Sequence, residues 1–151
     1  MRMEHVAVLV MIFMVVLCSR PVGAQNANIY NISFDERGEA SFYAIEVKLP
    51  ETSTAEEYAA ALITALFDKQ NSPNFAPVGT QILTLIINGN HLTMNLSREI
   101  LSFGEEYYNE CLRRQIAKTA LEVPQVDIVT ILVDNSNFYR IQRPSGNTLE
   151  H

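Results

Sequence analysis

The sequence predicts an α+β fold, a two-layer sandwich in which two helices pack on one face of a mixed, mostly antiparallel sheet. Apolar residues recur with strand-like and helix-like spacing in the order ββ-α-ββ-α-β. The chain has 151 residues, 48% of them hydrophobic, which suffices for one domain with a buried core. We expect that domain over residues 25–143, then a flexible tail over 144–151 in which 149–151 look like a vector remnant.

Residues 1–24 have the features of an export signal. Val6 to Cys18 is a run of thirteen apolar residues that follows Arg2, and it is shorter than the about 20 residues that span a bilayer. Val22-Gly23-Ala24 matches the pattern that signal peptidase accepts, so we expect cleavage before Gln25. The protein is therefore expected to be secreted or held in the cell envelope. The alternative is a retained segment that anchors the chain in the membrane.

The first predicted element is a hairpin. Residues 28–34 place Tyr30, Ile32 and Phe34 on one side, and a polar turn with a glycine follows over 35–39. Residues 41–49 then alternate between apolar and polar side chains.

A helix is predicted next. Thr54, with Glu57 three residues later, is a capping-box signature in front of AEEYAAALITALFDK. A stripe of apolar residues, Ala59, Leu62, Ile63 and Leu66, marks its buried side. Two prolines and a glycine over residues 71–79 predict a loop.

A second hairpin is the clearest local signal. The segments QILTLII and HLTMNL flank Asn88-Gly89-Asn90, and an Asn-Gly pair favours a type I′ turn. With Asn88-Gly89 at the turn, Leu85 is expected opposite Leu92 and Leu83 opposite Met94, on the core face. The other face is then half apolar and consists of Ile82, Thr84, Ile86, His91, Thr93 and Asn95.

A second helix and a closing strand complete the fold. Tyr108, Leu112, Ile116 and Ala120 recur every four residues within 105–122, and Pro124 follows. Residues 126–133 are apolar on nearly every side, which predicts a central strand covered on both faces. A short edge strand over 138–141 is a further expectation.

The sequence contains no group of residues whose types and spacing predict a catalytic site. Apart from the terminal His151, the domain has one histidine, His91, and one cysteine, Cys111, which the pattern places in a helix. A Cys-His hydrolase would need both. No metal-ligand or phosphate-binding spacing is present, and a net charge of −6 argues against a nucleic-acid binder. We therefore predict a protein that is not an enzyme and has no cofactor or metal.

Several segments resemble the GerMN domain family of sporulation and spore germination. They are Pro77-Val78-Gly79-Thr80, the hairpin ILTLIINGNHLTMNL, Leu96-Ser97-Arg98-Glu99, and LEVPQVDIVTILVD after the second helix; the first helix fits as well. The resemblance covers residues 28 to 134. Family members commonly have a glycine in the turn that is Asp134 to Asn137 here. The resemblance implies a non-catalytic extracytoplasmic domain, similar to ring-building modules that assemble protein complexes.

Two binding functions follow as hypotheses. The first is a protein-interaction domain whose contact face includes Phe42, Ile82, Ile86 and His91, with envelope or sporulation proteins as partners and self-association as an alternative. The competing interpretation is that the segment around Phe138-Tyr139 folds back over this face. The second function is binding of cell-wall glycan or a small ligand through Tyr30, Tyr43 and Phe75.

Overall fold

A computed structural model describes residues 25–68, 70–71, 78–102 and 104–144. The predicted export segment, residues 1–24, lies outside the described residues, as does nearly all of the tail. The described elements are, in order, β1 (Gln25–Phe34), β2 (Ala40–Leu49), α2 (Ala55–Phe67), β3 (Ile82–Asn88), β4 (His91–Leu96), the 3₁₀ helix η1 (Arg98–Leu101), α3 (Glu106–Ala120), β5 (Ile128–Val133) and β6 (Ser136–Gln142).

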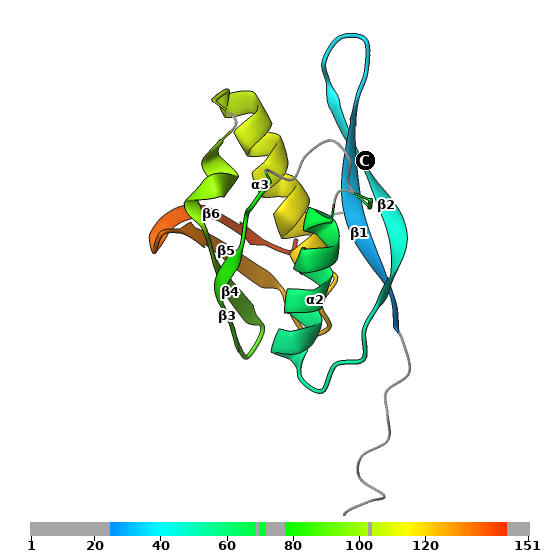
Figure 1. Cartoon of the computed structure of the whole chain (residues 1–151), viewed down its shortest axis with the longest axis vertical. Helices are drawn as coiled ribbons and strands as arrows, with labels where there is room; N and C mark the ends of the chain where they lie inside the picture. The colour runs from blue at the N-terminus through cyan, green and yellow to red at the C-terminus, as the bar shows by residue number, and fades with distance from the viewer. Residues whose placement is uncertain (1–24, 69, 72–77, 103, 145–151) are drawn as a thin grey trace, which may run out of the picture.

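The predicted α+β class is confirmed, with α2 and α3 on one face of a four-stranded sheet. Its strands lie in the order β3-β4-β5-β6, and β4 and β5 are parallel while the other neighbours are antiparallel. The first hairpin differs from the expectation of a single sheet. Strands β1 and β2 form their own two-stranded sheet on the far side of the helices, as Figure 1 shows.

The first hairpin forms a separate layer because a large part of the α3 surface is suited to burial. Seven residues of this helix are buried, namely Cys111, Leu112, Gln115, Ile116, Ala117, Thr119 and Ala120. That set is too wide for one stripe, so the four-stranded sheet alone cannot cover it. The hairpin supplies the second cover with Ile29, Ile32, Val47 and Leu49, which are at most 8% exposed. The core therefore lies on both sides of the helices.

Polar side chains help to fix the hairpin on α3. The Tyr30 N–H donates to Thr119 Oγ1 at 3.0 Å, and Gln115 Nε2 donates to Asn31 Oδ1 at 3.4 Å. Asn31 Nδ2 in turn donates to the Asn71 carbonyl at 3.2 Å. These bonds satisfy polar groups that burial would otherwise leave without water.

Helix α2 begins as the sequence predicts. Glu57 N–H donates to Thr54 Oγ1 at 3.1 Å, and Thr54 N–H donates to Glu57 Oε2 at 3.3 Å, so the capping box is complete. The four residues of the predicted stripe, Ala59, Leu62, Ile63 and Leu66, are all buried.

The second hairpin forms, but its turn is one residue later than predicted. Asn88 pairs with His91, so Gly89 and Asn90 are the central residues, and Gly89 has a φ of 61°. Glycine with positive φ at the first central position fits a type II′ turn. Leu85 consequently pairs with Met94, and Ile87 pairs with Leu92. Each partner on β4 thus lies two residues later than predicted. A shift by two residues keeps each side chain on its predicted face, apart from the bulge described below.

Strand β5 differs from the prediction that both of its faces are covered. Val129, Ile131 and Val133 are buried against the helices, whereas the alternate residues on the outer face are half-buried. The reason is the position of β6, which pairs along the edge of β5 instead of folding over the sheet.

Candidate functional site

The outer face of the sheet, opposite the helices, is the first candidate surface. Its central row consists of Ile86, Thr93 and Thr130, which pair across β3, β4 and β5. Ile86 is 53% exposed, and Leu83 on the same strand is 48% exposed. None of the described elements packs over this face. Phe138 and Tyr139, which could have covered it, pack against the core, and Arg113 of α3 lies 4.4 Å from the Phe138 ring centroid.

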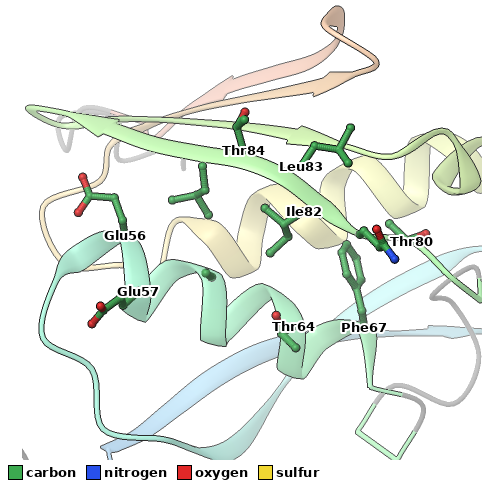
Figure 2. A pocket seen from close by; sticks show the side chains of 11 residues that line it. Glu56, Glu57, Thr64, Phe67, Thr80, Ile82, Leu83 and Thr84 are labelled. Atoms are coloured by element: carbon green, nitrogen blue, oxygen red, sulfur yellow. The ribbon is translucent and has the colours of Figure 1, made fainter.

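The structure brings together two of the four residues predicted for the contact face. Ile86 and His91 lie on the outer face, where His91 Nε2 is 2.8 Å from Thr130 Oγ1 of β5. Ile82 lies on the helix side, because the pairing shifts between Ile82 and Thr84 and this bulge turns Leu83 outward. Figure 2 shows Ile82 directed toward α2, with Leu83 on the opposite side of the strand.

Phe42, the fourth predicted residue, belongs to the separate hairpin. Its ring lies 5.2 Å from the Arg114 guanidinium and 5.7 Å from Lys118 Nζ, both on α3. The sequence could not reveal this, since period-two alternation assigns a side of the strand and not the sheet to which the strand belongs. Leu83 was missed for a similar reason, because nothing in the local sequence marks the bulge.

Cys111 and His91 do not form a catalytic pair. Cys111 is 3% exposed and lies on α3, so the sheet separates it from His91 on the outer face. Burial raises the pKa of the Cys111 thiol, which disfavours the reactive thiolate. Among the described residues, no three His, Cys, Asp or Glu side chains gather as a metal site would require.

A groove between α2 and β3 is the second candidate surface. It has a volume of about 610 Å³. Glu56 and Glu57 lie at one end of it and Phe67 and Thr80 at the other, as Figure 2 shows. The remaining lining residues are Ala60, Thr64, Gln81, Ile82, Leu83, Thr84 and Leu85. Sequence reasoning did not identify this groove, because it depends on the distance between a helix and a strand.

The aromatic residues predicted for glycan binding do not assemble. Tyr30 packs beneath Lys118 and donates its hydroxyl to Glu122 at 3.1 Å, Tyr43 is 47% exposed on the hairpin, and Phe75 lies outside the described residues. A different cluster forms from Phe34, Tyr107 and Tyr108, whose ring centroids are 5.7–6.3 Å apart.

The polar residues just before β3 and just after β4 contact each other where β3 begins and β4 ends. Ser97 N–H donates to the Gln81 carbonyl, and Gln81 N–H donates to Ser97 Oγ, both at 2.9 Å. Gly79 has a φ of 89°, a conformation that favours glycine. A hydrogen bond from the Ser97 hydroxyl, and a second one from the backbone N–H of Glu99 itself, lower the pKa of the Glu99 carboxyl. These residues therefore organise the strand ends.

Within the part of the chain that the structure describes, no helix is long and apolar enough to cross a bilayer. Comparison with known proteins gives a family and a fold. The model of the Germane family, described as sporulation and spore germination, matches residues 28–138. No curated protein matches the chain.

Two solved structures of the sporulation protein GerM from Bacillus subtilis are similar, each at 16% identity. Against its tandem GerMN domains the TM-score is 0.59, covering 81% of this chain and 45% of that one. Against its first GerMN domain the TM-score is 0.53, covering 82% and 92%. The chain thus spans about half the length of the tandem structure and nearly all of the single domain.

Proposed function

Because the chain belongs to the Germane family of sporulation and spore germination domains, we propose that it is a non-catalytic protein-interaction domain that works outside the cytoplasm, in the bacterial cell envelope. Its partners are envelope or sporulation proteins. The observation that carries the proposal is the outer sheet face, where Ile86 and Leu83 are about half exposed and no described element covers them. Apolar side chains gathered on an uncovered face are typical of contact surfaces.

The chemistry of the described residues supports the non-catalytic part of the proposal. The thiol of Cys111 is buried, and the imidazole of His91 is engaged with Thr130 on the other side of the sheet. A nucleophile needs a base within hydrogen-bonding reach, and this pair has none of that geometry.

An experiment with two matched variants tests the contact face. Ile86→Lys places a charge on the outer sheet face, and Tyr43→Lys places the same charge on a similarly exposed site of the hairpin. We expect Ile86→Lys to lose association with envelope proteins in affinity capture, while Tyr43→Lys retains it. Both variants should keep the circular dichroism spectrum of the parent. Unchanged capture by Ile86→Lys would remove this face from the proposal.

The extracytoplasmic location has its support in residues 1–24, with their short apolar run and the site before Gln25. Mass spectrometry of the protein recovered from culture medium and envelope fractions is the measurement. We expect a mature N-terminus at Gln25. Recovery of the intact chain from membranes would indicate a retained anchor, and recovery from the cytoplasm would contradict the location.

A glycan-binding function is the second candidate, and the cluster of Phe34, Tyr107 and Tyr108 favours it. Tyr107 is 49% exposed and Tyr108 is 37% exposed, and exposed aromatic rings are suited to stacking on sugars. A titration with peptidoglycan fragments, followed by NMR, is the test. Shifts centred on these rings would support glycan binding, and an unchanged spectrum would exclude it.

A further inference from the structure

We propose that the outer edge of β3, with which no strand of the described residues pairs, and the groove beside α2 bind an extended segment of a partner protein, which adds to the sheet as a further strand and carries a basic residue. The inference rests on the proposed interaction function and names a site and a class of partner for it. The segment would be apolar at alternate positions, as strand addition requires.

The two edges of the four-stranded sheet differ in how they are protected against pairing with a further strand. Strand β6 at one edge has an exposed cation, Arg140, and the pairing of β5 with β6 is irregular beside Leu132. Strand β3 at the other edge reads ILTLIIN and has no charged residue or proline along its length. Proteins usually protect edge strands with charges, prolines or bulges. The one bulge of β3 lies at its start, so no described residue protects the rest of this edge against pairing.

The pairing of β3 with β4 determines which backbone groups face outward. Asn88 and His91 close the two-residue turn, so they form a hydrogen-bonded pair, and bonded and non-bonded pairs alternate from there. Leu85 and Ile87 are therefore non-bonded positions. Their N–H and C=O groups point away from β4, toward the side on which a new strand would lie.

The groove beside this edge has a form and charge that fit an extended basic segment. On the helix side its wall carries Ala60 and the exposed Thr64, which leave space along the strand. Its lining includes two carboxylates and no basic residue. Glu57 is engaged in the capping box, whereas Glu56 takes no part in it. A lysine or arginine of the partner would meet Glu56 at that end of the groove.

The same charge argument disfavours a second copy of this chain as the occupant. If β3 of another copy paired with this edge, the segment Gln81 to Asn88 would bring no cation to Glu56. It would also offer an uncharged strand to an acidic groove. A heterologous segment supplies the missing charge.

Amide exchange measured by NMR tests strand addition directly. The probe is a short capped peptide in which valine and threonine alternate after one lysine. We expect it to slow the exchange of the Leu85 and Ile87 amides at least tenfold at saturation, without comparable protection in β6. Binding without protection at Leu85 and Ile87 would overturn the proposal, and so would the absence of binding. Protection that grows with protein concentration alone would show that the occupant is a second copy.

Three variants test whether the peptide binds in the groove or elsewhere on the surface. Glu56→Lys should weaken peptide binding about two- to fivefold, the effect of one charge pair at the protein surface. Glu46→Lys makes the same charge change on the exposed side of the hairpin and should leave binding unchanged. Thr64→Trp fills the groove from an exposed helix position and should abolish binding without loss of the fold. Equal effects of Glu56→Lys and Glu46→Lys, or full binding by Thr64→Trp, would refute the site.

The outcome is independent of the test of the outer face. If Ile86→Lys loses envelope partners while the peptide does not bind, the interaction function stands and strand addition fails. If the peptide binds and Ile86→Lys captures partners normally, the contact site is the β3 edge instead of the outer face.

Discussion

Asn95 and Asn135 bind each other through two hydrogen bonds. Asn95 Nδ2 donates to Asn135 Oδ1, and the Asn135 N–H donates to Asn95 Oδ1, both at 3.0 Å. Asp134 and Asn135, with φ values of 48° and 64°, are the central residues of the turn between β5 and β6. The family resemblance predicts a glycine in this turn. Here asparagine, which tolerates positive φ better than most residues, is also tied to β4.

We expect Asn135→Ala to lower the free energy of unfolding by about 1–3 kcal/mol, because alanine is strained at positive φ and loses a side-chain hydrogen bond. Asn135→Gly should cost less, since glycine accepts the conformation and keeps the backbone N–H bond to Asn95. Urea denaturation of both variants is the measurement. Equal losses would mean that the turn conformation contributes nothing to the difference.

The turn that follows α3 contains a residue whose replacement by glycine should stabilise the protein. Gln125 follows Pro124, is exposed and has a φ of 71°, and the Val126 N–H donates to the Val123 carbonyl at 3.1 Å. Gln125→Gly should raise the free energy of unfolding by about 0.5–1 kcal/mol, because it relieves the left-handed strain. Thermal denaturation checks this, with Gln125→Ala as a control that should give no such gain.

The hydroxyl of Thr119 should stabilise the attachment of the first hairpin. It accepts the bond from the Tyr30 N–H in a fully buried position. Thr119→Val keeps the shape but leaves that donor without its partner, so we expect a loss of about 1–3 kcal/mol. Thr119→Ser keeps the hydroxyl and should lose less. Amide exchange at Tyr30 is an independent readout, which should accelerate in Thr119→Val and stay slow in Thr119→Ser.

Ser97 should control the acid titration of Glu99. The hydrogen bond from Ser97 lowers the pKa of Glu99 in the folded protein. A carboxylate with a lowered folded pKa stabilises the fold at pH above its unfolded pKa, which is about 4.3. That contribution is lost as the pH falls through the folded pKa. Ser97→Ala should therefore raise the pKa of Glu99, as followed by NMR of the carboxyl carbon. An unchanged titration would show that Ser97 has no such role.

Cys111 should resist alkylation in the folded protein. Its side chain is buried, and burial raises the pKa of its thiol. Iodoacetamide should react at a rate set by unfolding, and the rate should rise steeply near the urea midpoint. Rapid reaction in the absence of urea would instead point to an accessible thiol and would reopen the hydrolase hypothesis.

The sequence by itself determined the local elements. The capping box of Thr54 and Glu57 and the stripe in α2 are encoded within a few residues, so their signals survive without tertiary information. The tight turn of the second hairpin was also predicted, but one residue too early and as type I′. The half-apolar outer face was also readable, because the two-residue alternation of side chains persists through the shifted register of β3 and β4. The family resemblance came from the same segments and is confirmed over residues 28–138.

Only the tertiary structure decided where the first hairpin lies, that a bulge exchanges the faces of Ile82 and Leu83, and that β3 borders a groove with α2. Each of these depends on contacts between residues far apart in the chain, such as Tyr30 with Thr119. Hydrophobic periodicity identifies which side of an element is buried but not which element covers it. The candidate binding surfaces are products of that long-range packing, and for this reason the sequence indicated an interaction domain without locating its groove.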